Sequence, residues 1–154
     1  MFNWKYFGKA HKLLYRLSGG RYGSKMGWIK VALVDTVGRK SGLPREIPLS
    51  YTRTSAGVAV LAGFGRSTGW AHNLRARPRA DVLVGDTRYA ATAVEVTDPL
   101  QALRATRAVM CDAGAAGFFY GWDPRRASDE QVRRVVAETC CFHLRFDELP
   151  PWAA

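Results

Sequence analysis

The stretch TVGRKSGLPR, from Thr36 to Arg45, contains residue types that together can bind an anion. Its two glycines permit a tight turn and a close approach of the backbone to a ligand. Arg39 and Lys40 add adjacent positive charges and Ser41 a hydroxyl, and the amides of such a turn can form an anion-binding nest. Arg45 has a planar guanidinium that can hold a carboxylate or phosphate through two hydrogen bonds. The stretch predicts a phosphate-binding loop, although taken alone it could equally be a solvated hairpin.

No other group of residues in the sequence has the spacing of a catalytic or metal centre. The three histidines are scattered, and no two carboxylates are placed for acid–base catalysis. Cys111, Cys140 and Cys141 are three cysteines with two adjacent, which suggests buried thiols in a reducing compartment rather than disulfides. The basic loop is therefore the most informative stretch of the chain.

Further short motifs follow the loop. They are PL at 48–49, GFGR at 63–66, WAHNLRARP at 70–78 and VLVG at 82–85. Written together, GRKSGxPRxxPL, GFGR, WxxNLxAxP and VxVG resemble the deazaflavin-dependent nitroreductase family, also described as coenzyme F420-dependent quinone reductases. The resemblance covers residues 30–97 closely and the rest of the chain more loosely.

The resemblance implies an α+β, mainly β, single-domain split β-barrel related to the FMN-binding and flavin-reductase-like barrels. It also implies hydride transfer from reduced coenzyme F420, an 8-hydroxy-5-deazaflavin, to a quinone, enone or nitroaromatic acceptor. Because the cofactor supplies that chemistry, the protein need only bind the cofactor, orient it and polarise the acceptor. In such proteins the GRKSG loop holds the cofactor's phosphate, which implies that role for Arg39, Lys40, Ser41 and Arg45. By position, the ring of the cofactor is expected along Pro48, Ser50, Leu61, Gly63, Phe64, Gly65, Trp70 and Asn73.

This sequence departs from the family pattern at the ring end. Ser50 stands where a tyrosine is frequent, and Tyr51, one place later on a strand, would face the other side. Gly63-Phe64 replaces a polar Ser-Lys pair of some quinone reductases, and Ala71 replaces an aromatic residue. The phosphate end is intact, so cofactor binding follows from the resemblance more directly than the class of acceptor does.

Two residues of the implied ring site allow a second interpretation. Trp70 can be a wall of the pocket or an anchor of the core. Asn73 carries an amide that needs hydrogen-bond partners when buried, and a heterocyclic ring edge or backbone groups could supply them.

The segment Gly114–Pro124 (GAAGFFYGWDP) is aromatic and glycine-rich, as a mobile lid over a flat acceptor would be. Tyr120 could donate a hydrogen bond to a carbonyl oxygen and stabilise the charge that develops on it, or it could be a core aromatic residue. Phe118, Phe119 and Trp122 are expected to pack or to form apolar walls.

The elements that must position these residues follow from periodicity and punctuation. A single domain is expected, with an N-terminal amphipathic helix in 1–20, the barrel and cofactor motifs in 28–97, helices and lid in 98–138 and the last strand in 139–147. Period-two runs and turn residues predict strands over 29–35, 47–53, 58–62, 82–84, 89–96 and 139–146. Helical spacing, capping residues and proline predict helices over 2–17, 70–77, 100–112 and 129–138.

The composition is that of a globular protein with a strong basic excess. The 154 residues carry a formal net charge of +10, and residues 1–50 hold ten Lys/Arg against two acidic residues. This imbalance favours an acidic partner, and a phosphorylated cofactor with several glutamates fits it. The N-terminal helix could dock on its own domain or lie on an anionic membrane surface. The chain shows neither a signal peptide nor a membrane-spanning stretch, so a cytoplasmic protein is expected, either free or peripheral on the inner face of the cell membrane.

Other functions fit the sequence less well. A split-barrel carrier of a fatty acid, or of the deazaflavin itself, would bind without turnover, and unsaturated lipids could also be acceptors. An FMN-dependent oxidoreductase on the same fold remains an alternative, because a phosphate loop alone does not choose the ring system. No nucleic-acid partner is expected, since the chain lacks a recognition motif. A monomer and a homodimer are both compatible with the sequence.

Overall fold

A computed structural model describes residues 25–26, 29–62, 68–113 and 120–153. The predicted N-terminal helix, and Gly63, Phe64, Gly65, Phe118 and Phe119, lie outside these residues. Membrane association through that helix therefore stays a prediction. Within the described residues, no helix is long and apolar enough to cross a bilayer.

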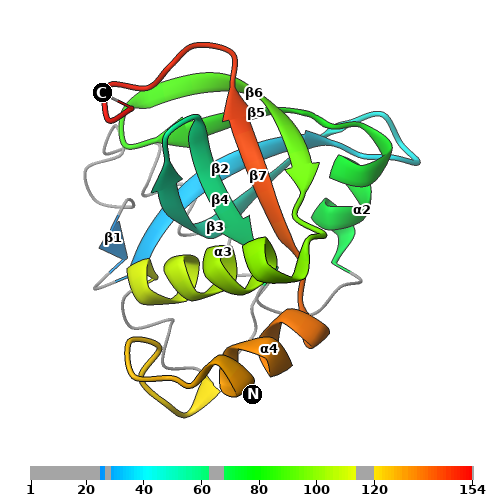
Figure 1. The fold of residues 1–154 in the computed structure, drawn as a ribbon. Helices are drawn as coiled ribbons and strands as arrows, with labels where there is room; N and C mark the ends of the chain where they lie inside the picture. Colours follow the sequence, from blue (N-terminus) through cyan, green and yellow to red (C-terminus); the bar gives the residue numbers. More distant parts are fainter. Residues whose placement is uncertain (1–24, 27–28, 63–67, 114–119, 154) are drawn as a thin grey trace.

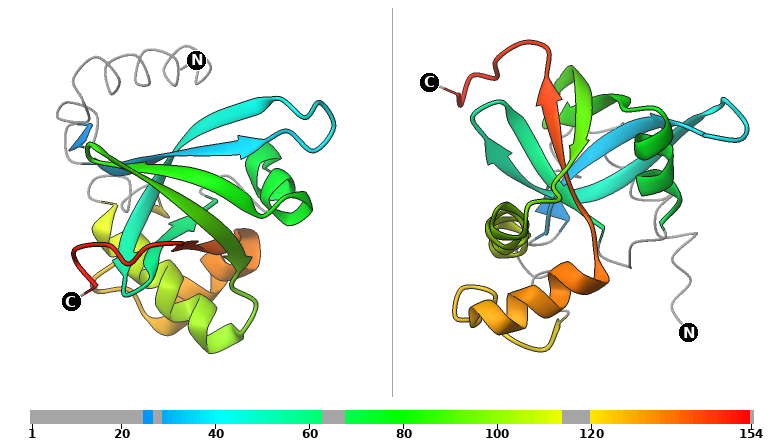
Figure 2. Two further views of the ribbon diagram at one scale, coloured as in Figure 1. Left: turned by 90° about the horizontal axis from the view of Figure 1, so that it is seen from above. Right: turned by 45° about the vertical axis from the view of Figure 1, so that its right-hand side comes forward.

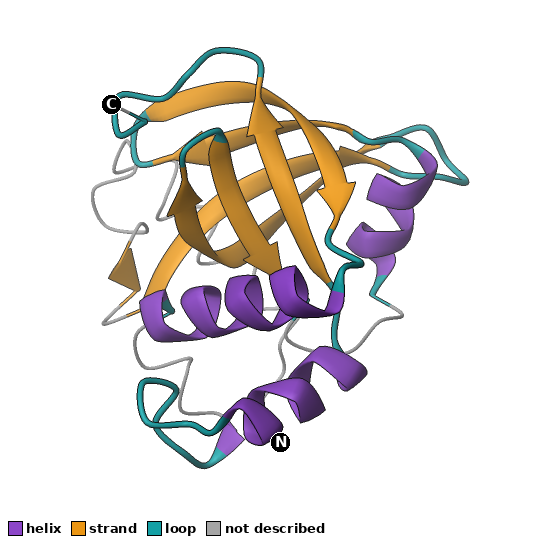
Figure 3. Ribbon diagram, viewed as in Figure 1, coloured by secondary structure: helices purple, strands orange, loops and turns teal. Residues whose placement is uncertain are grey.

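Six antiparallel strands form a closed barrel (Figures 1 and 3). In the order of their pairing they are β2 (Ile29–Val37), β3 (Pro44–Thr54), β4 (Gly57–Leu61), β7 (Cys141–Phe146), β6 (Thr87–Glu95) and β5 (Arg79–Val84). The barrel closes because β5 pairs back onto β2 through Leu33–Asp35. A short strand, β1 (Lys25–Met26), pairs with the start of β2. The predicted mainly β barrel is confirmed.

Three described helices lie outside the barrel (Figure 2). They are α2 (Gly69–Ala76), α3 (Pro99–Asp112) and α4 (Asp129–Glu138). The capping residues expected from the sequence begin the last two. Asp98 accepts a hydrogen bond from the amide of Gln101 at 2.8 Å, and Ser128 forms a capping box with Gln131. Side chains close in sequence thus fix where these helices start.

The apolar side chains form two clusters separated by the barrel wall. The inner one fills the barrel, with Tyr51, Val60 and Phe142 among its members. The outer one lies between β4, β7 and the helices, and contains Leu61 and Val109. Strand β4 is buried on both faces because it contributes to both clusters, which explains why its sequence does not alternate.

Several strands begin at other residues than the sequence predicts, mostly where the ends of the strands are polar. Strand β3 begins at Pro44 rather than residue 47, because its exposed first residues, Pro44 and Arg45, continue the pairing with β2. Strand β5 begins at Arg79, three residues earlier than expected. Strand β7 begins at Cys141, because Thr139 still belongs to the end of α4 and donates to the carbonyl of Val135. Polar ends of strands carry no apolar periodicity, so the sequence could not reveal them.

Candidate functional site

The predicted phosphate loop is the turn of the hairpin that joins β2 to β3. The amide of Gly38 donates to the carbonyl of Leu43 and that of Gly42 to Gly38, each at 2.8 Å. Gly42 has a φ of 69°, a conformation that other residues rarely adopt. A side chain at Gly38 would lie 2.6 Å from the hydroxyl of Ser41. Gly42 is therefore needed for this loop shape, whereas a side chain at Gly38 would require the hydroxyl of Ser41 to move.

The buried amide of Asn73, on α2, braces the loop. Its Oδ1 accepts from the backbone amide of Arg39 at 3.0 Å, and its Nδ2 donates to the hydroxyl of Thr36 at 3.3 Å. That hydroxyl donates in turn to the carbonyl of Arg45 at 3.2 Å. Asn73 therefore positions the loop, and its direct contact with a cofactor stays a prediction. Thr36, which is 1% exposed, belongs to this brace and was not among the residues expected at the site.

The cations of the loop are exposed and available. Arg39, Lys40 and Arg45 form no ion pair with any carboxylate of the described residues. The nearby carboxylate of Asp35 is engaged elsewhere, at 2.6 Å from the guanidinium of Arg88. A loop with three such cations, whose shape is held by its own backbone hydrogen bonds, is suited to an anionic group.

The residues expected beside the cofactor ring divide between the two faces of the barrel wall. Tyr51 and Val60 pair across β3 and β4 and point into the barrel, so their neighbours Ser50 and Leu61 point outward. Pro48, two residues before Ser50, shares that outer face and is half-buried. Leu61 belongs to the outer apolar cluster. The structure thus brings these three predicted residues to one face of the wall, where Leu61 packs with helix residues such as Val109.

Trp70 lies on the other side of the wall. It is 6% exposed and packs edge-on against Phe142, with ring centroids 5.5 Å apart. This packing matches the core interpretation of Trp70, while its contact with a cofactor stays a prediction. The residue before α2, Thr68, has a buried hydroxyl that bonds to none of the described residues.

Tyr120 contacts the outer apolar cluster, to which Leu61 belongs. Its ring stacks on Trp122 with centroids 5.9 Å apart. The phenol oxygen is buried and forms no hydrogen bond within the described part of the chain. Burial, together with the charge of Glu138, raises the pKa of Tyr120 above its usual value. The hydroxyl therefore stays protonated near neutral pH and can donate to a ligand.

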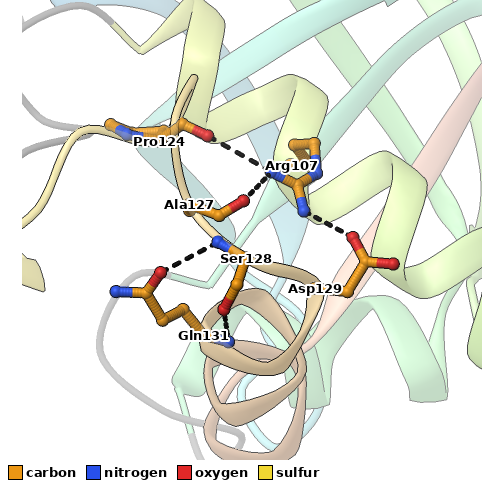
Figure 4. Close-up of polar contacts among 6 residues, drawn as sticks. All are labelled: Arg107, Pro124, Ala127, Ser128, Asp129 and Gln131. Atoms are coloured by element: carbon orange, nitrogen blue, oxygen red, sulfur yellow. Dashed lines mark hydrogen bonds and ion pairs between the residues drawn. The ribbon is translucent and has the colours of Figure 1, made fainter.

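A guanidinium from α3 holds the segment that follows Tyr120 (Figure 4). Arg107 donates to the carbonyl of Ala127 at 2.7 Å and to that of Pro124 at 3.5 Å, and it pairs with Asp129 at 2.7 Å. These contacts tie α3 to the turn before α4. No short sequence pattern indicates this role of Arg107, because its partners are 17 to 22 positions away.

The fold defines a class of protein. A Listeria innocua structure described as a pyridoxamine 5′-phosphate oxidase matches with a TM-score of 0.54 and 12% identity, over 78% of this chain and 86% of that one. The conserved hypothetical protein Rv2991 from Mycobacterium tuberculosis matches with a TM-score of 0.57 and 18% identity, over 77% and 73% of the two chains. With the closed six-stranded sheet, these similarities identify the fold as a split β-barrel.

The family follows from the sequence. A model of the F420H(2)-dependent quinone reductase family matches residues 7–116, so this chain belongs to that family. The F420H(2)-dependent quinone reductase Rv1261c of Mycobacterium tuberculosis is 36% identical over 97 residues. That similarity covers 59% of this chain and 65% of the relative, slightly less than two thirds of its length. The family resemblance drawn from the motifs is confirmed.

Proposed function

We propose that this protein is an oxidoreductase that uses reduced coenzyme F420 to reduce a quinone-type acceptor. The observation that carries the proposal is the β2–β3 loop, whose shape is fixed by Gly38, Gly42 and Asn73 and whose cations lack carboxylate partners among the described residues. Family membership supports the same activity, and the relative Rv1261c bears it in its name.

The loop suits the anionic part of the cofactor. Arg39, Lys40, Ser41 and Arg45 would hold its phosphate, and the basic charge of the first 50 residues suits its glutamates. A ligand that needs several cations fits this loop better than neutral ligands do. When bound in its reduced form, the coenzyme supplies a hydride.

The outer face of β3 and β4 would receive the ring of the cofactor. Pro48, Ser50 and Leu61 provide a mostly apolar surface there, which limits the access of water. Gly63, Phe64, Gly65, Trp70 and Asn73 remain the further residues proposed for this end.

Tyr120 is proposed to act on the acceptor. Its buried, protonated hydroxyl can donate a hydrogen bond to a carbonyl oxygen, on which negative charge develops during reduction. Arg107 is a positioning residue, because it holds the chain that follows Tyr120 without itself belonging to the apolar cluster. Enones, nitroaromatics and unsaturated lipids are finer possibilities for the acceptor, and each offers an atom on which negative charge develops.

Turnover with a soluble quinone tests the proposal. Protein, reduced coenzyme F420 and menadione are mixed, and the return of the oxidised coenzyme's absorbance is followed. We expect saturable, protein-dependent oxidation that is much slower with Tyr120→Phe. Tight binding of the coenzyme without any turnover would instead identify a carrier. Turnover with reduced FMN alone would identify an FMN enzyme.

A further inference from the structure

The barrel has a cavity at the end opposite the phosphate loop. The cavity has a volume of about 760 Å³, within the range of small-molecule sites, and none of the described residues expected at the cofactor site lines it. Its lining includes Lys30 at the start of β2, whereas the loop follows Val37 at the other end of that strand. In Figure 1 the start of β2 and the C-terminal segment lie on the left, and the β2–β3 hairpin lies on the right.

Aromatic rings form the walls of this cavity. Tyr51, Tyr89 and Trp152 line it. Trp152 comes from the C-terminal segment and is held by a hydrogen bond from its Nε1 to the carbonyl of Thr54 at 3.1 Å. It also packs edge-on against Tyr89, with centroids 5.8 Å apart. These rings are fixed by the fold and offer flat apolar surfaces to a ligand.

Arg53 places a cation in this aromatic cavity. Its guanidinium carbon lies 4.6 Å from the centroid of Trp152. No carboxylate of the described residues pairs with it. Stacking uses the face of a guanidinium and leaves its N–H edges available. The cavity therefore contains a held cation that can still bind an oxyanion through two hydrogen bonds.

The other charges limit the charge of the ligand to one. The ammonium of Lys30 lies 3.7 Å from Asp112, which largely neutralises it, and the same carboxylate oxygen accepts from Thr52 at 2.6 Å. Asp86 also lines the cavity, and its carboxylate accepts from the hydroxyl of Thr87 at 3.0 Å. Two carboxylates near the site would repel a dianion such as a phosphate monoester. A single carboxylate matches Arg53, which among the described residues that line the cavity is the cation without a carboxylate partner.

We propose that this cavity binds a planar aromatic monocarboxylate, with its ring against Tyr89 and Trp152 and its carboxylate on Arg53. The volume accommodates a body of two or three fused rings. This site is separate from the proposed cofactor site, and ligand binding there does not depend on the proposed reductase activity.

Calorimetric titration of the full-length protein with 2-naphthoate tests the proposal. We expect saturable binding that weakens about tenfold or more in Arg53→Gln, as the loss of a charge-assisted bidentate contact predicts. Arg53→Lys keeps the charge without the planar fork, so an intermediate loss is expected. Neutral 2-naphthol should bind more weakly and show no difference between the wild type and Arg53→Gln.

The matched control is Arg39→Gln, which removes the same group from the phosphate loop and should leave naphthoate binding unchanged. Arg53 is exposed, so the melting temperature should change little in either variant. Absence of saturable binding by 2-naphthoate would overturn the proposal. So would equal affinity in the wild type and Arg53→Gln, or a loss in Arg39→Gln alone, because binding would then lie at the phosphate loop.

Discussion

The β2–β3 loop and the Tyr120 region, the two parts of the candidate site, are held in different ways. The loop holds its shape through hydrogen bonds between residues up to nine positions apart, with one brace from Asn73. The Tyr120 region depends on Arg107, whose partners lie 17 to 22 positions away, and on apolar packing between β4 and the helices. The loop thus offers preformed charge, whereas the Tyr120 region offers one polar group on an apolar surface. We expect the loop to govern affinity for the cofactor and Tyr120 to govern the rate with an acceptor.

The largest effect is expected from removing the charges of the loop. Arg39→Ala with Lys40→Ala should weaken coenzyme F420 binding about a hundredfold, because each charge-assisted hydrogen bond contributes roughly 1.5–3 kcal/mol. Fluorescence titration measures this affinity. The control is Arg133→Ala with Arg134→Ala, an adjacent exposed pair on α4 that removes the same charge. Equal losses in both double variants would mean that only the net charge matters.

Tyr120→Phe should separate rate from affinity. We expect kcat/KM for menadione to fall about tenfold or more, since one donor to a developing oxyanion contributes on that scale or above. Affinity for the coenzyme should stay unchanged. The fold should be no less stable, because the hydroxyl lacks a partner among the described residues. Loss of coenzyme affinity in this variant would contradict the division between the two regions.

The pH dependence of the same reaction sharpens that prediction. Burial raises the pKa of Tyr120, so its proton is retained up to a higher pH than in a free phenol, whose pKa is about 10. The contribution of the hydroxyl should therefore be present at neutral pH and be lost only as the pH rises above that value. If the wild type and Tyr120→Phe reduced menadione at the same rate already below about pH 8, the hydroxyl would not act as a donor.

Arg107→Ala should have a smaller effect and act on the acceptor side. Loss of its contacts with Ala127 and Asp129 should destabilise the fold by about 1–3 kcal/mol and raise KM for menadione several-fold. Arg107→Lys should restore part of the stability and part of the KM effect, because an ammonium can keep one of the hydrogen bonds of Arg107. Arg104→Ala, an exposed arginine on the same helix, is the control. If Arg107→Ala destabilised the protein but left the KM for menadione unchanged, Arg107 would have a structural role and no positioning role.

The smallest effect is expected at the brace of the loop. Thr36→Val and Asn73→Ala should each weaken coenzyme binding a few-fold, because the loop would lose part of its fixed shape. The two changes remove one shared hydrogen bond. The double variant should therefore lose less free energy of unfolding than the two single variants together, with a coupling energy of about 0.5–1.5 kcal/mol. Simple additivity in urea unfolding would show that the bond between Asn73 and Thr36 contributes nothing.

The sequence predicted the local features of the molecule well. The loop glycines, the caps of α3 and α4 at Asp98 and Ser128, and the strands with one buried face follow from short-range chemistry. The family resemblance rested on motifs of the same short range. By contrast, Asn73 serves the loop from 34 positions away, and Trp70 packs into the barrel rather than toward its outer face. Which face of a wall a residue occupies depends on how the barrel closes, and no short pattern records that.

Direct binding of the cofactor tests the central claim. Full-length protein is titrated with oxidised coenzyme F420 and, in parallel, with FMN, and fluorescence reports saturation. The expected result is saturable binding of coenzyme F420 that is much tighter than that of FMN and is lost in the Arg39→Ala, Lys40→Ala variant. Equal or tighter binding of FMN, or coenzyme binding that survives in that variant, would contradict it.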